Sequence, residues 1–367
     1  MKKLIPIALL LTLFAACKQD PKININNPND PDSLYQSSAY SGFPALTNRY
    51  RKIIIPADNP MTAEGVALGR MLFYDPVLSA DSTVSCASCH NPRFNFSDST
   101  PTSKQVFGSL TNRTTQVLID MGVQKRFFWD GRKSTLEDAV ADAMQGEQHF
   151  NYVFAKNKLE AQQRYTYLFK KAFGRPGDVT EDKIKKAIAQ FLRTFVSYNS
   201  KFDKFMRGEA SLTTDETEGF AIFNDNNRGD CFHCHADGPY LTFANQTLMF
   251  ANNALDSVNF LYEFEDKGLG VFTFDENDNG RFKIPTLRNV MLSPPYMHDG
   301  RFSTIEEVIG HYSDSLKYSP NVDPLMQRFN DRGVHINQTE KNQLIAFIKT
   351  LTDTTFINKP EYQNPFK

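Results

Sequence analysis

Cys86-Ala87-Ser88-Cys89-His90 has the pattern C-x-x-C-H, and the same pattern occurs again in Cys231-Phe232-His233-Cys234-His235. Two thiols at this spacing can bond to the two vinyl groups of one haem, and the adjacent His can then ligate the iron. Two disulfides or a Cys/His zinc site are the alternatives, but neither explains why a His follows both pairs. The sequence therefore predicts two covalently attached c-type haems, held by Cys86, Cys89 and His90 and by Cys231, Cys234 and His235.

The N-terminus has the pattern of an export signal. Lys2 and Lys3 precede an apolar run over residues 4–14, and small residues precede Cys17. This pattern predicts a lipoprotein-type signal peptide over residues 1–16 and a lipidated Cys17, with plain export and cleavage near Ala16 as the alternative. The apolar run is too short to span a membrane. Residues 17–40 are polar and predict a flexible tether, so we expect a protein on the periplasmic side of the envelope that meets the membrane only through its lipid anchor.

Composition fits a soluble exported protein with two ordinary cores. Hydrophobic residues make up 40% of the 367 residues and the formal net charge is −1. A nearly neutral chain has no strong attraction for polyanions. The sequence therefore predicts no nucleic-acid partner.

Helical periodicity dominates the rest of the chain. Apolar residues recur at helical spacing over 62–73, 183–196 and 339–351, and shorter helices are expected from 135, over 215–223 and from 304. The expected caps are Ser134, Thr213 or Thr214, Thr304 and Thr339. No stretch alternates like a sustained strand. We expect a mainly α fold with two similar units, residues 41–205 and 206–367, joined near residues 201–212.

Several further motifs resemble those of the bacterial di-haem cytochrome c peroxidase family, which includes the MauG-like enzymes. They occur in the family's order, at residues 67–76, 128–132, 283–290 and 295–300. The resemblance implies two cytochrome c-like domains with one haem each, calcium between them and hydrogen peroxide as substrate. It also implies a small electron-donor protein of the cytochrome c or cupredoxin type, and it allows a homodimer.

In this family the first haem is the peroxide site, which makes His90 its proximal ligand. Many members carry a second His about 15 residues later that blocks the other face of the iron. This chain has no His over residues 91–148, so we expect an iron that is five-coordinate or water-bound without reductive activation. Met121 and Met144 could ligate in principle, but both are expected in the core.

The distal acid of the peroxide site has two candidates. Alignment without gaps places the family's distal Glu on His149 and its distal Gln on Ala139, and Glu147 lies two residues from His149. A carboxylate or a neutral imidazole can move a proton between peroxide oxygens. Glu147 and His149 therefore both stay candidates, with solvated helix-end residues as the alternative.

The second haem would have His235 as its proximal ligand. The family's sixth ligand, a Met or Tyr, falls on Tyr312, with His311 as the competitor and Met297 as a weaker one. A phenolate ligand lowers the haem potential relative to Met. His233, inside the motif, is expected to have a structural role or to be exposed.

Two further roles come from the resemblance. Trp129, the one Trp of the chain, matches the residue that carries electrons between the haems, although core packing is the common role of a Trp. The calcium carbonyls match Ser293 and Pro295. The Asn side-chain ligand falls on Thr114, with Asn112 nearby.

These residues predict a di-haem peroxidase that reduces hydrogen peroxide to water, with peroxide at the first haem and electrons entering through the second. A MauG-like oxidase of a protein side chain is the first alternative. A di-haem electron-transfer protein is the second, and it would need the first iron to be capped on both faces.

Overall fold

The computed structural model describes residues 36–46, 50–237, 240–241, 246–327 and 332–367. The predicted signal peptide, and Cys17 with its lipid anchor, lie outside these residues. Within them no helix is long and apolar enough to cross a membrane.

The described chain is mainly helical, as predicted. Its α-helices are α1 Ala63–Tyr74, α2 Cys86–Cys89, α3 Leu136–Gly146, α4 Tyr152–Glu160, α5 Gln163–Phe173, α6 Glu181–Arg193, α7 Lys201–Met206, α8 Thr214–Asn224, α9 Phe232–His235, α10 Gly270–Thr273, α11 Ile305–Asp314, α12 Pro324–Gln327, α13 Gln338–Lys349 and α14 Thr354–Ile357. The strands form two antiparallel pairs, β1 Ala236–Asp237 with β2 Tyr240–Leu241 and β3 Phe250–Ala251 with β4 Phe282–Lys283.

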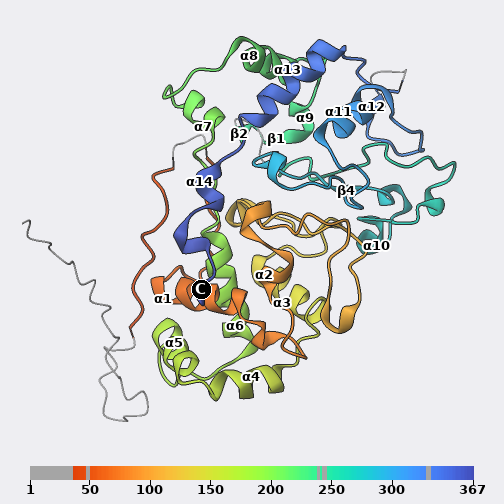
Figure 1. The fold of residues 1–367 in the computed structure, drawn as a ribbon. Coiled ribbons are helices and arrows are strands. Elements are labelled where there is room, and N and C mark those ends of the chain that lie inside the picture. Colours follow the sequence, from red (N-terminus) through yellow and green to blue (C-terminus); the bar gives the residue numbers. More distant parts are fainter. Residues whose placement is uncertain (1–35, 47–49, 238–239, 242–245, 328–331) are drawn as a thin grey trace, which may run out of the picture.

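Two lobes make up the molecule (Figure 1). The first lobe carries α1 to α6 and the first C-x-x-C-H motif at α2, and the second carries α8 to α13 and the second motif at α9. Each lobe has its own apolar cluster. α7 packs on the second lobe, where Phe202 contacts Phe220 and Phe347, and the predicted boundary at residues 205 and 206 stays a prediction.

In the first lobe α1 packs closely on α6. Thr62 caps α1, because its hydroxyl accepts from the Gly65 amide at 3.0 Å. Gly69 allows the two helices to approach, since a Cβ there would lie 1.9 Å from the Ala187 carbonyl oxygen. No side chain larger than hydrogen fits at this crossing without moving backbone.

The second lobe repeats this arrangement with α8 and α13. Thr213 caps α8 through the Glu216 amide. A Cβ on Gly219 would lie 1.9 Å from the carbonyl oxygen of Gln343, so the same close crossing requires glycine here as well. The caps at Thr213 and Thr304 are those that the sequence predicted.

Two predicted caps were wrong. Thr135, not Ser134, caps α3 because its hydroxyl reaches the Asp138 amide. Asn337, not Thr339, caps α13, and its side chain accepts from two amides of the first turn. In both places a nearby residue that is also a favourable N-cap type has its side-chain oxygen close enough to accept a hydrogen bond from the third amide of the helix.

A second repeat precedes α3 and α11. Phe128-Trp129-Asp130-Gly131-Arg132-Lys133-Ser134-Thr135 ends at the cap of α3, and Met297-His298-Asp299-Gly300-Arg301-Phe302-Ser303-Thr304 ends at the cap of α11. The first residue of each run has a positive φ (67° and 73°), and so does each glycine (69° and 72°). Trp129 and His298 therefore hold corresponding positions in the two lobes.

The C-terminal segment returns to the first lobe. α14 descends from the second lobe and the C-terminus lies beside α1 (Figure 1). Phe356 and Tyr362 are buried in the apolar cluster of the first lobe, and Arg70 Nε of α1 donates to the Gln363 carbonyl at 2.8 Å. The sequence predicted these residues as part of the second unit, residues 206–367. Their apolar pattern predicts that they are buried, but it does not predict the surface against which they pack.

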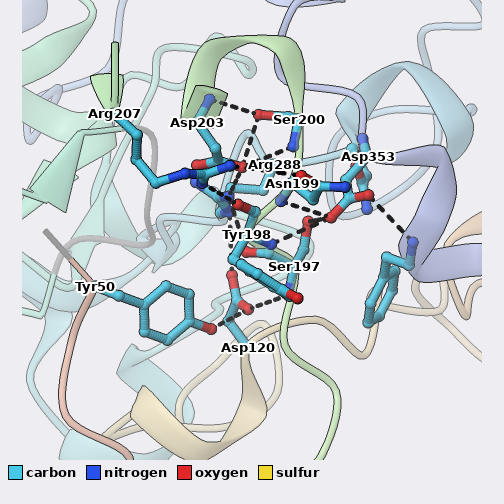
Figure 2. Close-up of polar contacts among 12 residues, drawn as sticks. Tyr50, Asp120, Ser197, Tyr198, Asn199, Ser200, Asp203, Arg207, Arg288 and Asp353 are labelled. Carbon is cyan, nitrogen blue, oxygen red and sulfur yellow. Dashed lines mark hydrogen bonds and ion pairs between the residues drawn. The ribbon is translucent and has the colours of Figure 1, made fainter. Parts of the chain in front are cut away.

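A buried polar network ties the lobes together at the junction (Figure 2). The Arg288 guanidinium lies between the carboxylates of Asp120, at 3.4 Å, and Asp203, and it also donates to the Ser197 carbonyl at 2.8 Å. The Tyr50 hydroxyl donates to Asp120. Burial raises the pKa of Asp120 to about 6. One buried cation thus serves two carboxylates, contributed by segments far apart in the sequence.

Candidate functional site

One continuous cavity of about 1700 Å³ runs between the lobes, and both C-x-x-C-H motifs lie on its wall. The rest of the wall is largely apolar and comes from α3 and α6 of the first lobe and from α11 and α13 of the second. Such an apolar enclosure suits large planar cofactors.

No disulfide joins the four cysteines of the motifs. Burial raises the pKa of Cys86, Cys231 and Cys234 to about 12 and that of Cys89 to about 11, which disfavours the thiolates that a zinc site requires. Among the described residues no three His, Cys, Asp or Glu side chains gather as a metal cluster. The disulfide and zinc interpretations of the two motifs therefore have no support in the structure.

Both motif histidines are held in the tautomer that ligation requires. His90 Nδ1 lies 2.7 Å from the Phe96 carbonyl oxygen, and His235 Nδ1 lies 3.1 Å from that of Pro285. A carbonyl oxygen only accepts, so Nδ1 carries the proton and the lone pair is on Nε2, as is usual for ligating histidines. Burial lowers the pKa of both rings, that of His235 to about 4, so both are neutral. The residues therefore fit two haems in this cavity.

His233 does not take part in this arrangement. Its Nδ1 pairs with the Asp230 carboxylate, and its ring packs 4.0 Å from that of Phe232. This placement agrees with the structural role expected for it.

Glu147 and Gln148 present two unpartnered oxygens beside the first motif. Both residues line the cavity at the end of α3, and neither Glu147 Oε2 nor Gln148 Oε1 has a hydrogen-bond partner among the described residues. Gln148 Nε2 lies 3.6 Å from Cys86 Sγ, which places the pair next to the first haem motif. Burial raises the pKa of Glu147 to about 7. Gln148 is a cavity residue to which the sequence assigned no role.

His149 does not line the cavity. Its side chain is exposed, its φ is +47°, and its ring makes an edge contact with Phe107 at 5.6 Å. The backbone reverses direction directly after α3, so the residue that follows Gln148 points outward. Of the two candidates for the distal acid, the structure brings only Glu147 to the haem cavity.

Tyr312 lines the cavity on the side of the second motif. Its hydroxyl accepts from Asn253 Nδ2 at 3.1 Å. Burial raises the pKa of Tyr312 to about 12, and the nearby thiols of Cys234 and Cys231 add to the rise. Without a metal the side chain is therefore a neutral phenol.

The competitors of Tyr312 have other partners. His311 Nε2 is 3.0 Å from the Asn253 carbonyl oxygen, and its ring lies outside the cavity wall beside Phe302. Met297 does line the cavity, and its sulfur accepts from Asn253 Nδ2 at 3.5 Å. Asn253 thus contacts all three candidates, a link that no local pattern around residue 253 indicates.

Trp129 lies on the cavity wall and is fixed from both sides. Its Nε1 donates to the Thr114 carbonyl at 2.9 Å, and its own carbonyl accepts from the Lys283 amide at 2.7 Å. Thr114 in turn receives support from the second lobe, because its amide donates to the His298 carbonyl at 2.8 Å. The ring is thus held at the junction of the lobes.

The predicted calcium residues show no contact that requires a cation. Asn112, Thr114, Ser293 and Pro295 all line the cavity. The Thr114 hydroxyl donates to the Met297 carbonyl at 2.9 Å, so its proton is committed and only its lone pairs remain for a metal. Calcium stays a prediction.

Comparisons with known proteins agree with this geometry. Residues 63–211 match the family model described as di-haem cytochrome c peroxidase. The chain is 32% identical over 316 residues to the methylamine utilization protein MauG of Methylorubrum extorquens, covering 84% of each. It is also 32% identical over 319 residues to the cytochrome c551 peroxidase of Nitrosomonas europaea, covering 85% of each.

The chain belongs to the di-haem cytochrome c peroxidase and MauG family. A solved structure, a MauG-like protein associated with microbial copper homeostasis, superposes with a TM-score of 0.80 at 30% identity and covers 88% of this chain and 99% of its own. The protein is therefore a peroxidase-family oxidoreductase with the family's mainly helical di-haem fold. Membership implies two c-type haems, peroxide as substrate, a cytochrome as electron donor and a periplasmic location.

Proposed function

We propose that this family member reduces hydrogen peroxide to water at the first motif, with electrons entering through the second. When bound, the haems would supply an iron face for peroxide and a path for two electrons. The observation that supports the proposal most is Glu147, whose Oε2 faces the cavity without a partner and whose pKa is raised to about 7 by burial. A carboxyl with this pKa can take a proton from one peroxide oxygen and return it to the departing oxygen near neutral pH.

The other side chains have supporting tasks in this proposal. Gln148, beside Glu147, can accept a hydrogen bond from bound peroxide through its free Oε1. Trp129 forms the aromatic contact between the lobes along which electrons pass. The electron donor is a small cytochrome c or cupredoxin. The calcium at residues 112–114 and 293–295, the lipid anchor at Cys17 and a homodimer also belong to the proposal.

Two measurements test the peroxidase assignment. The imidazoles that the described residues place on the cavity wall are His90, His235 and His298, and the His298 ring stacks on Phe282 at 3.6 Å. We therefore expect the oxidised protein to show one high-spin ferric haem by electron paramagnetic resonance. It should also react with peroxide without prior reduction. Two low-spin haems and no reaction before reduction would support the electron-transfer alternative.

Trp129→Phe separates the entry of electrons from the reaction with peroxide. Both haems should remain bound, the first reaction with peroxide should proceed at the rate of the unmodified protein, and steady-state turnover with an external donor should slow. Unchanged turnover would make Trp129 a packing residue.

A MauG-like oxidase is the second candidate, and the position of Tyr312 favours it. The tyrosine lies on the cavity wall near the second motif, while His311 faces away. Two of the relatives are named for methylamine utilization and one solved structure for copper homeostasis. Peroxide-dependent oxidation of a protein partner, with little turnover of small redox donors, would favour this candidate over the peroxidase.

A further inference from the structure

Lys283 is a buried cation on the wall of the haem cavity. It lies in β4, it is 7% exposed overall, and it lines the cavity. Its Nζ donates a hydrogen bond to Gln124 Oε1 at 2.5 Å. Among the described residues the ammonium thus binds a neutral amide oxygen. A buried ammonium without an anion is costly, so its position calls for a counter-ion.

The arginines of the same wall are all paired with carboxylates. Arg113 binds Asp266 at 2.7 Å and Asp130, Arg132 binds Asp142 at 2.7 Å, Arg288 binds Asp203, and Arg301 binds Asp256 at 2.8 Å. Lys267, the other lysine on the wall, is exposed and is solvated by water. Lys283 is thus the buried cation of this wall for which the described protein residues provide no carboxylate.

The burial of Lys283 makes its charged ammonium form energetically unfavourable. Burial alone lowers the pKa of Lys283 to about 8, and no neighbouring charge opposes the shift. A buried charge of this kind is retained when another group compensates it.

The position of Lys283 in the fold indicates which anion could be the counter-ion of its ammonium group. Its amide binds the Trp129 carbonyl, and Gln124 reaches it from the first lobe. Two residues later Pro285 orients the ring of His235. The ammonium therefore lies on the cavity wall where the two lobes meet, and the anionic groups that a c-type haem carries are its two propionates.

We propose that the Lys283 ammonium is the counter-ion of a haem propionate and that this pairing raises the midpoint potential of that haem. A positive charge near the propionate disfavours the additional positive charge of ferric iron, so it favours the reduced state. The proposal rests on the two haems of the family and not on the peroxide reaction. A protein that lacked peroxidase activity would still test it.

Lys283→Met is the central variant, and Lys267→Met is its matched control. The haem content of each purified variant is measured first, and then the two midpoint potentials by spectroelectrochemical titration. Lys283→Met should lower the potential of one haem clearly, Lys283→Arg should keep it close to that of the unmodified protein, and Lys267→Met should leave both potentials unchanged. Equal potentials in Lys283→Met and in the unmodified protein, with two haems bound, would overturn the proposal.

A second measurement applies if Lys283→Met does not mature with two haems. Resonance Raman bands from propionate bending respond to hydrogen bonding, so Lys283→Arg, which keeps the charge but changes the donor, should shift one such band. The band of the Lys267→Met protein should stay in place. Identical propionate bands in Lys283→Arg and in the unmodified protein would show that Lys283 does not contact a propionate.

Discussion

Gly69 of α1 lies against Ala187 of α6 in the first lobe, and Gly219 of α8 lies against Gln343 of α13 in the second. A Cβ added to either glycine would lie 1.9 Å from the carbonyl oxygen of the facing helix. The lobes also share the positive-φ turn and threonine cap that lead into α3 and α11. They differ in what these helices present to the cavity, because α3 ends in an acid, Glu147, and α11 carries a phenol, Tyr312.

This difference indicates how one scaffold can support two tasks. The packing that holds each motif is common to both lobes, so it carries no information on which haem reacts. The side chain across the cavity carries that information, since an acid can move protons and a phenol can bind a metal. Variants at the side chains that differ should therefore affect one lobe only, whereas variants in the shared packing should affect both lobes alike.

Replacement of Glu147 should have the largest effect. Glu147→Gln should lower kcat/KM for peroxide by about 10²- to 10⁴-fold, because the amide cannot take up a proton. Since burial raises the pKa of Glu147 to about 7 and the carboxylate is the active form, kcat/KM of the unmodified enzyme should rise as the pH increases through about 7. Steady-state kinetics against pH measure both effects.

His149→Gln is the control for this prediction. The ring is exposed and lies outside the cavity wall, so its replacement should change kcat/KM little. A large loss in His149→Gln with an active Glu147→Gln would assign the distal role to His149.

The junction between the lobes should show the next largest effect. Arg288→Met leaves Asp120 and Asp203 buried without their shared cation, and breaking such a buried pair costs about 3–5 kcal/mol. Denaturant unfolding measures this loss. Arg281→Met, which removes a partly exposed pair with Asp278, should cost at most about 1 kcal/mol.

The sequence predicted the repeated parts of this molecule better than the parts that differ. The caps at Thr213 and Thr304 and the helices that they begin follow from local patterns. The return of Phe356 and Tyr362 to the first lobe could not be predicted, because apolar spacing specifies burial and not the partner. The choice between Glu147 and His149 depends on the positive φ of His149, directly after α3. The sequence around His149 has no pattern that predicts this backbone conformation.

The shared helix crossings should respond equally in the two lobes. Gly69→Ala and Gly219→Ala each place a methyl group within 2 Å of a backbone carbonyl oxygen, and overpacking of this kind costs about 1–3 kcal/mol. Denaturation should show similar losses for the two variants. Gly146→Ala is the control, because a Cβ there meets nothing within 4 Å. A loss in only one lobe would mean that the two crossings are not equivalent.

The smallest effect on activity and stability, but the sharpest distinction between the lobes, is expected from Tyr312. Its phenol lies on the cavity wall beside the second motif, and its hydroxyl accepts from Asn253. Ligation as phenolate would have to overcome a pKa of about 12, which an iron ion can do because it stabilises the anion. Tyr312→Phe should then raise the midpoint potential of the second haem or open its coordination site, since an anionic ligand stabilises ferric iron.

His311→Ala should change the absorption spectrum little, because Nε2 of that ring is bound to a backbone carbonyl. If His311→Ala alters the spectrum strongly and Tyr312→Phe does not, the second haem has two histidine ligands. The contrast between an acid and a phenol would then no longer separate the two lobes, and the peroxidase assignment would gain over the MauG-like one.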